Sequence, residues 1–475
     1  MEPRRNWAYW ITPGLLSLLL GTFLALTACK DRDTPIAPGG ANANSALRAD
    51  NSVPGTYHDP AERCVSPATD PTTPAVPVAV WMRTDKAIVS DKPSPYLTAD
   101  FVREINSYTF DQAPSWARSG RVIANLDGDR TQIYNSKLDG TDQHCLSCDH
   151  PNNNTGNGQP AENGLAHERP QGDWILFHST RGHSIVYGGA GLGGVGDALW
   201  VMRPDGSCPV QLTGIGGAGE LTNDFHAYWS PDGKHIIWTH ISGNFQIDDL
   251  SNGTEFTIRL ADFVDDGSKP PHLENITIVG PRGENYETQP WAPDGSGFLF
   301  QYSNAGQNQE VYYMRLFGNG ATPLTPQVQQ LTDDHPGWDE QAVFTPDMSA
   351  IIYMSGRDCP TCLYTLQTTL TQLLGVPQLP QGLDGIVYIP IFFGAVLPAF
   401  ALPPSLLGFK TDLYLLDLHT KALRRLTDDD GVIPEFYFDF EGKKLIWSEN
   451  HIYGENGVPL MFTNNTQTAY FEGLP

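Results

Sequence analysis

Carboxylate, imidazole and amide side chains recur at one place in a pattern that the chain repeats six times. The pattern centres on a short polar turn, and these side chains come just ahead of it. They are Asp111, Gln112, His167, Glu168, Asp224, His226, Glu287, Gln289, Asp339, Glu340, Gln341 and Glu435. Neutral imidazole and carboxylate are good ligands for divalent metal ions, and convergent carboxylates attract cations. If one axis collects the six turns, we expect a binding face made of His167, His226, Glu287, Gln289, Glu340, Gln341 and Glu435.

The turn that follows these residues has the sequence aromatic-x-Pro-Asp-Gly in its clearest copies, at residues 229–233 and 291–295. Residues 344–348 are a third copy, and degenerate copies lie at 116–120, 168–172 and 438–442. Pro presets φ for a turn, Asp accepts backbone hydrogen bonds, and Gly adopts positive φ. A short apolar strand follows each turn, so each unit predicts a β-hairpin.

Each unit continues with further short strands. A third strand is predicted around residues 132–134, 199–202, 256–258, 311–314 and 413–416. An outer strand is predicted at 144–147, 210–213, 329–333 and 424–428, and three of these four contain Leu-Thr. Four short strands cannot bury a face alone, but repeated units close radially into a β-propeller. The sequence therefore predicts an all-β, six-bladed propeller of four-stranded blades over residues 101–475; the alternative is a β-sandwich with coincidental turns.

The run ending in Leu-Thr, then aromatic-Ser-Pro-Asp-Gly, then an apolar strand resembles the TolB-type propeller repeat. The resemblance covers about residues 111–449. It implies the propeller fold and leaves function open, because such blades serve translocation-system proteins, peptidase-associated propellers and oligogalacturonate-lyase-like enzymes. The separate amino-terminal α/β domain of TolB itself has no counterpart here, because residues 30–100 show no helical periodicity.

The resemblance also implies a metal-binding alternative for the candidate face. In oligogalacturonate-lyase-like propellers a cluster of His and Gln at the channel holds a divalent metal ion. His167, His226, Gln289 and Gln341 imitate that cluster, although the motif does not match residue by residue. Polar residues that solvate a wet channel explain the same pattern without a ligand. A divalent cation is thus the one cofactor that the sequence raises.

The amino terminus predicts an exported lipoprotein. Arg4 and Arg5 precede an apolar run over residues 15–26, which is too short for a membrane span. The run ends in Leu-Thr-Ala-Cys at residues 26–29, which resembles a bacterial lipoprotein processing box. We therefore expect residues 1–28 to be removed and Cys29 to carry acyl chains that hold the protein to a membrane of the cell envelope, facing the periplasm or exterior.

A Pro-rich segment, residues 29–100, follows this signal and predicts a flexible tether. Within it, residues 76–82 are the exception, with a pattern that predicts a strand closing the last blade. The formal net charge is −25, and removing Glu2, Arg4 and Arg5 with the signal leaves −26. So acidic a surface repels phosphate backbones and excludes nucleic acid as a partner.

Six cysteines remain after Cys29, and an oxidising compartment favours disulfides. Spacing favours the local pairs Cys145–Cys148 and Cys359–Cys362, which leaves Cys64 for Cys208. The two Cys-x-x-Cys pairs also allow a four-thiolate zinc site, although they fall on different blades.

Residues 363–410 form an apolar, Pro-rich insertion that lengthens the fifth unit. We expect either a buried flap over a blade or an apolar patch for a partner or lipid. The sequence contains no Gly-x-Ser-x-Gly elbow and no His-Glu-x-x-His motif. The favoured hypothesis is a non-catalytic envelope lipoprotein whose propeller face binds a protein or polysaccharide. The alternatives are a metal-dependent polysaccharide lyase or hydrolase and a purely structural lipoprotein.

Overall fold

A computed structural model describes most of the predicted propeller. The described residues are 82–83, 90–106, 108, 110, 113–126, 129–150, 153–155, 158, 160–182, 197–214, 221–243, 255–267, 269–280, 285–303, 309–317, 323–333, 339–358, 411–428, 435–453 and 461–474. All of them belong to the second of two units, residues 57–475. The signal, Cys29, Cys64, the pair Cys359–Cys362 and the insertion 363–410 lie outside the described residues. Within the described ranges, no helix has the length and hydropathy of a membrane span.

Six sheets make up the fold; four are built from consecutive strands only, and the fourth and sixth each add a strand from nearer the amino terminus, β1 (Met82–Arg83) and β2 (Asp100–Ile105). The first holds β3 (Ser115–Trp116), β4 (Val122–Leu126), β5 (Asp129–Ser136) and β6 (His144–Cys145); the second holds β7 (Asn163–Glu168), β8 (Ile175–Ser179), β9 (Ala198–Met202) and β10 (Val210–Gln211). The third holds β11 (Leu221–Trp229), β12 (His235–Gly243), β13 (Glu255–Val264) and β14 (His272–Ile278); the fourth holds β15 (Asn285–Trp291), β16 (Gly297–Ser303), β17 (Gln309–Phe317) and β18 (Pro323–Gln330). The fifth holds β19 (Asp339–Phe344), β20 (Ala350–Ser355), β21 (Asp412–Asp417) and β22 (Leu423–Arg425). The sixth holds β23 (Phe436–Phe438), β24 (Lys444–Tyr453), β25 (Met461–Glu472) and β2 (Asp100–Ile105).

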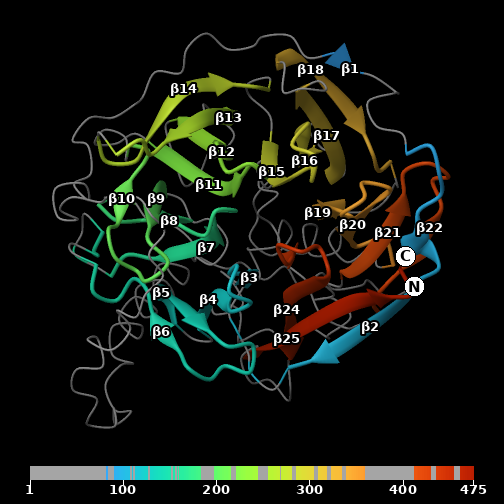
Figure 1. Ribbon diagram of the computed structural model, residues 1–475, viewed down its shortest axis with the longest axis horizontal. Coiled ribbons are helices and arrows are strands. Elements are labelled where there is room, and N and C mark those ends of the chain that lie inside the picture. The colour runs from blue at the N-terminus through green and yellow to red at the C-terminus, as the bar shows by residue number, and fades with distance from the viewer. Residues whose placement is uncertain are drawn as a thin grey trace, which may run out of the picture. The chain divides into compact units, whose positions relative to one another are not determined.

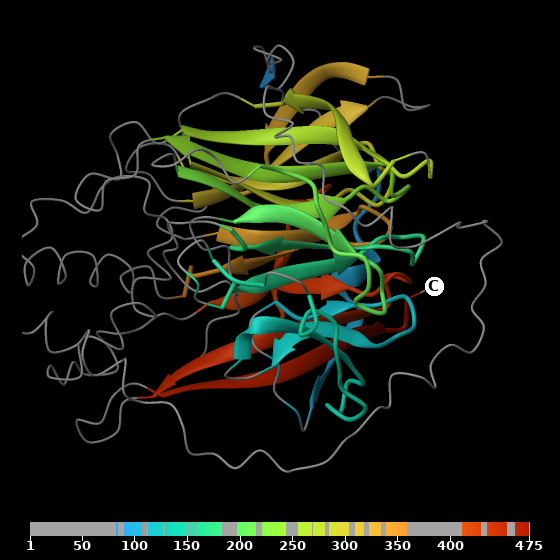
Figure 2. The same ribbon diagram turned by 90° about the vertical axis from the view of Figure 1, so that its left-hand side faces the viewer.

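The sheets form a closed ring around one axis (Figure 1). The first strand of each blade contacts the first strand of the next, in the order β3, β7, β11, β15, β19 and β23, and β23 contacts β3 again. Seen from the side, the strands run along the axis of this ring (Figure 2). The predicted six-bladed propeller of four-stranded blades is therefore confirmed.

Strands in the middle of a blade are buried on both faces, because a neighbouring blade covers each face. On β12, Ile236 and Trp238 pack with Trp174 of the second blade. Between them, Ile237 points to the other face and packs with Phe298 of the fourth blade. This two-sided burial explains why the strand after each turn reads as a continuous apolar run rather than an alternating one.

The repeated turn forms the hairpin between the first two strands of each blade. In the third blade, Gly233 has φ 65° and its N–H donates to Ser230 O at 2.8 Å. The Asp232 carboxylate accepts from the Ser230 hydroxyl at 2.7 Å and from the Lys234 backbone N–H at 3.1 Å. In the fifth blade Met348 occupies the glycine position with φ 57°, and the Asp347 carboxylate still accepts from the backbone N–H of Ser349. The turn residues thus hold the hairpins through the hydrogen bonds that the sequence predicted.

The hydroxyl of the Leu-Thr pair has a structural role that recurs from blade to blade. Thr213, Thr332 and Thr427 each accept a hydrogen bond, at 2.9 Å, from a backbone N–H at the start of the third strand. In the first blade, Ser147 accepts from the backbone N–H of Ile133 in the middle of β5, at 2.9 Å. Each hydroxyl lies two residues beyond the end of the outer strand and satisfies a backbone N–H of the neighbouring strand, which accounts for the repetition of this residue type.

The ring closes through an amino-terminal strand. β2 (Asp100–Ile105) pairs antiparallel with β25 and is the outer strand of the sixth blade. The expectation that residues 76–82 close this blade is wrong, because β1 (Met82–Arg83) pairs instead with β18 of the fourth blade. Just ahead of β2, Tyr96 is buried against Phe471, with ring centroids 5.0 Å apart. Packing therefore reaches into residues that the composition assigned to the tether.

Candidate functional site

A β-bulge in the first strand of the blade positions the candidate residues. Pairing between the first and second strands shifts register in the second to fifth blades. At these bulges Leu165, His226 and Gln341 have φ of 44°, 47° and 34°. Such a bulge re-aims the side chains beside it, so the inner strands do not simply alternate between two faces.

Six of the seven predicted face residues gather in one buried group on the axis. We call this group the axial cluster; it consists of His226, Glu287, Gln289, Gln301, Glu340, Gln341, Glu435, Tyr228 and Tyr437. Its predicted members are almost fully buried, with Glu287 and Glu340 the most exposed at 7 % each. From the sequence we expected these residues to line a channel open to water. In the structure they form a buried polar cluster instead.

The Gln301 amide links the fourth and fifth blades in the cluster. Its Nε2 donates to Glu287 Oε2 and, at 2.9 Å, to Glu340 Oε1. Its Oε1 accepts from Gln289 Nε2 at 3.1 Å and from the Gln341 backbone N–H at 3.4 Å. Gln301 was missed by the sequence reasoning, which searched only the first strands. A polar residue directly after the apolar run 298–300 was the available signal.

Two contacts cross the axis between opposite blades. His226 of the third blade lies 3.5 Å from Glu435, which comes just before β23 of the sixth blade, measured from Nε2 to Oε1. The hydroxyls of Tyr228 and Tyr437, from the same two blades, are 3.3 Å apart, and Tyr437 also donates to Glu435 Oε2. On its other side, His226 Nδ1 is 3.6 Å from Glu287 Oε2. Side chains therefore bridge the ring from one side to the other.

Burial controls the protonation of Glu435. Loss of solvation is the main cause that raises its pKa, and the charge of Glu340 adds to it, while the hydrogen bond from Tyr437 acts in the opposite direction. The resulting pKa is about 8. A proton on Glu435 near neutral pH keeps the number of buried negative charges down.

His167 lies apart from the carboxylates. Its ring contacts the rings of Tyr228 and Tyr437, with centroids 5.0 and 4.7 Å away. Burial, and to a smaller degree the neighbouring His178, lowers the pKa of His167 to about 3, so its imidazole is neutral. Its Nε2 is buried and makes no hydrogen bond within the described chain.

Other acidic residues of the pattern hold the sheets together. Asp224 Oδ1 accepts from Trp238 Nε1 at 2.7 Å and from His240 Nδ1 at 2.6 Å. Asp339 accepts from the Ser355 hydroxyl, and Glu168 accepts from the Arg118 backbone N–H of the first blade. Asp111 and Gln112 lie outside the described residues.

The described part of the chain contains no group of three or more His, Cys, Asp and Glu side chains arranged to hold a metal ion. Of the four residues that imitate a metal cluster, His226, Gln289 and Gln341 belong to the axial cluster and His167 packs beside it. What the cluster offers chemically is a set of carboxylate oxygens, two of which, from Glu287 and Glu340, flank one amide nitrogen.

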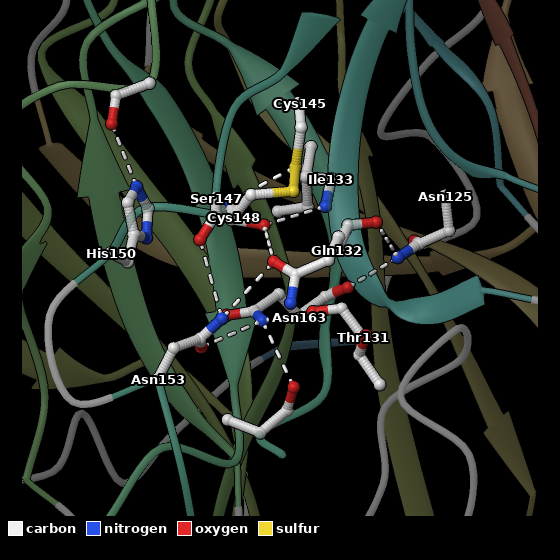
Figure 3. The surroundings of a disulfide bond; sticks show 12 residues. Asn125, Thr131, Gln132, Ile133, Cys145, Ser147, Cys148, His150, Asn153 and Asn163 are labelled. Atoms are coloured by element: carbon white, nitrogen blue, oxygen red, sulfur yellow. Dashed lines mark hydrogen bonds between the residues drawn. A yellow bond between two sulfur atoms is a disulfide. The ribbon is translucent and has the colours of Figure 1, made fainter. Parts of the chain in front are cut away.

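Two of the cysteine assignments fall on described residues. Cys145 and Cys148 are joined by a disulfide at the end of β6, surrounded by Gln132, Ser147, Asn153 and Asn163 (Figure 3). These two sulfurs are therefore not thiolate ligands, and the four-thiolate zinc alternative is wrong. Cys208 also belongs to a disulfide, and its partner lies outside the described residues, so the pairing with Cys64 stays a prediction.

Comparison with known proteins gives fold-level similarity only. No family model matches the chain, and no curated protein is similar to it. Among solved structures, a putative TolB from Agrobacterium tumefaciens is 16% identical over 70% of this chain and 81% of its own, with a TM-score of 0.38. TolB from Acinetobacter baumannii is 13% identical over 77% of this chain and 63% of its own, with a TM-score of 0.36. An oligogalacturonate lyase in complex with manganese is 10% identical over 81% of this chain and 99% of its own, with a TM-score of 0.34. At such values the similarities carry no argument about function, and the fold rests on the six sheets themselves.

Proposed function

We propose that this protein is a lipid-anchored binding protein of the bacterial cell envelope that uses one propeller face to hold a cationic group of a protein or polysaccharide. The observation that carries the proposal is the pair of contacts across the axis, His226–Glu435 and Tyr228–Tyr437. Side chains that meet across the ring hold the inner strands together, and Glu287 and Glu340, the most exposed carboxylates of the axial cluster at 7 % each, are the groups that we expect a ligand to contact. A surface that is already ordered loses little conformational entropy when a ligand binds.

The carboxylates supply the expected specificity. Glu287 and Glu340 come from neighbouring inner strands and share one amide donor, Gln301. A carboxylate oxygen accepts more than one hydrogen bond, and we expect an ammonium or guanidinium group of the ligand to donate to both carboxylates. Charge-assisted hydrogen bonds of this kind are about twice as strong as neutral ones.

Replacing Glu287 and Glu340 together by Gln is the test of the binding face. Gln keeps an oxygen for the Gln301 amide but removes the charge, so the fold should persist while affinity for a polyamine such as spermine falls by about tenfold or more. Isothermal titration calorimetry of the full chain with spermine, and separately with Mn²⁺, measures this.

The matched control is Glu274→Gln with Glu472→Gln, which removes two exposed carboxylates from the outer part of the propeller. That variant should bind spermine like the parent. Equal affinity in the parent and the double variant of Glu287 and Glu340 would refute the binding face. Stoichiometric Mn²⁺ binding, together with Mn²⁺-dependent cleavage of polygalacturonate, would favour the lyase alternative.

Anchoring through Cys29 is tested independently of the ligand. The processing box at residues 26–29 predicts that Cys29→Ser moves the protein from the membrane fraction to the soluble fraction. Circular dichroism should still report the β-rich fold, because the propeller lies far along the chain from Cys29. Membrane association that survives the substitution would assign the contact to the apolar insertion at 363–410.

A further inference from the structure

Arg181, at the end of the second strand of the second blade, buries a positive charge among neutral groups. The residue is 4 % exposed. Its Nη2 lies 3.0 Å from His150 Nδ1, 3.1 Å from Asn153 Oδ1 and 3.2 Å from Asn163 Oδ1. In the described chain no carboxylate pairs with it, and burial is the one cause that lowers its pKa, to about 10. A buried charge that lacks a counter-ion is costly.

His150 does not compensate that charge. Its Nε2 faces the carbonyl oxygen of Gly206 at 2.9 Å, so Nε2 carries the proton and Nδ1 presents a lone pair to Arg181. Burial, followed by the charge of Arg181, lowers the pKa of His150 to about 4. The imidazole is therefore a neutral acceptor, as the two Asn oxygens are.

Hydrogen-bond donors are left over at the same place. The guanidinium carbon of Arg181 lies 4.4 Å from the centre of the Trp200 ring. Arg181 Nε and Trp200 Nε1 are both buried, and neither has a hydrogen-bond partner in the part of the chain that the structure describes. Both are donors, so the shortage is one of acceptors and negative charge. Buried polar atoms in native proteins are almost always hydrogen-bonded.

Two other arginines of this region each have a carboxylate partner, which Arg181 lacks among the described residues. Arg203 stacks over Trp174 at 3.7 Å and lies 4.0 Å from Asp265, between Nη2 and Oδ2. Arg169 lies 4.9 Å over Phe263 and forms an ion pair with Asp173 at 3.0 Å. Both have an aromatic partner and a carboxylate, whereas Arg181 has the aromatic partner and neutral oxygens.

The neutral acceptors are held in place before any ligand arrives (Figure 3). Asn163 Nδ2 donates to Asn153 Oδ1 at 3.2 Å and to Thr131 O at 2.5 Å. Asn153 Nδ2 in turn donates to Gln132 Oε1 at 3.3 Å, and Gln132 also accepts from Ser147, which lies between the two disulfide cysteines. This frame joins the first and second blades and fixes the orientation of both amides toward Arg181.

We propose that Arg181 and Trp200 form a binding site for an oxyanion, the carboxylate or the sulfate or phosphate group of a ligand, at the boundary of the first and second blades. A guanidinium group has five N–H donors, and those on Nε and Nη1 make no hydrogen bond within the described residues. An oxyanion would supply the charge that Arg181 lacks and an acceptor for the indole N–H. The site is separate from the axial cluster and takes a ligand of opposite charge.

The experiment measures the melting temperature of the full chain as sodium sulfate or sodium acetate replaces sodium chloride at constant ionic strength. In the parent we expect a saturable rise, because a ligand that binds only the folded state stabilises it. Arg181→Gln should abolish the saturable rise, while Arg203→Gln, which removes an arginine stacked on tryptophan in the same blade, should retain it. A saturable rise with sulfate but not with acetate would indicate a sulfate or phosphate ligand. A saturable rise with acetate but not with sulfate would indicate a carboxylate ligand.

A rise of equal size in Arg181→Gln and the parent would overturn the site, since sulfate also stabilises proteins by exclusion from their surface. A second measurement needs no variant. In nitrogen-15 spectra of the parent, one arginine Nε–H resonance should shift saturably with the active anion. Absence of such a shift for either anion would also overturn the proposal.

Discussion

Glu435→Gln is expected to make the protein more stable than the parent at pH 8 and to flatten its pH dependence between pH 5 and 8. In the folded parent the pKa of Glu435 is raised to about 8, mainly by burial, whereas an unfolded glutamate titrates near 4.5. Between these values the folded state holds a proton that the unfolded state has released. Folding stability of the parent therefore falls as pH rises through this range, by at most about 1.4 kcal/mol per pH unit for one proton.

Gln imitates the protonated carboxyl and still accepts a hydrogen bond from Tyr437, so the variant lacks this titration. Urea unfolding monitored by tryptophan fluorescence at pH 5, 6, 7 and 8 gives the free energy of unfolding of each form. Glu441→Gln is the control, because Glu441 is an exposed residue of the same blade whose pKa is lowered by a hydrogen bond from Lys443. An identical slope in the parent and Glu435→Gln would mean that Glu435 is ionised in the folded protein.

Gly297→Ala is expected to be among the most damaging single-methyl changes in the propeller. Gly297 opens β16 opposite Arg315 of β17. A Cβ atom there would lie 1.9 Å from the carbonyl oxygen of Met314 and 2.8 Å from the Cα of Arg315. Both obstacles are backbone atoms in the middle of a blade, so relief requires separating two strands. We expect a loss of about 3 kcal/mol or more in the free energy of unfolding.

Gly280→Ala supplies the comparison for this glycine. Gly280 is buried, as Gly297 is. A Cβ atom at Gly280 would contact only the Ile258 side chain, at 3.9 Å or more. Its free energy of unfolding should stay within about 0.5 kcal/mol of the parent. Chemical denaturation of both variants measures the two free energies of unfolding. Similar values for Gly297→Ala and Gly280→Ala would contradict the tight strand contact at Gly297.

The six blades could be predicted from the sequence because the residues that specify each hairpin are close to one another in the chain. Turn residues such as Asp232 and Gly233 act on backbone atoms a few positions away, and the apolar run after them follows from burial on both faces. The closing strand was misplaced because β2 pairs with β25 from the opposite end of the propeller. Nothing in the sequence near residue 100 specifies a partner so distant.

The candidate site was predictable in membership but not in arrangement. Position ahead of the turn identified His226, Glu287 and Glu435, which do meet. Their burial was not foreseen, because it depends on side chains reaching across the ring from opposite blades. The bulge at His226 and the role of Gln301 also arise from pairing between strands, which residue types alone do not encode.

The place of β2 has a consequence for how the protein is made. The ribosome synthesises Asp100–Ile105 long before its partner strand, β25. Until then β2 has no sheet to join, and β24 has an unpaired edge in the sixth blade. Contacts so distant in sequence are formed slowly, and exposed strand edges invite pairing with other chains. Completion of the sixth blade therefore waits for β25, and loss of that strand would leave both β2 and β24 without their partner.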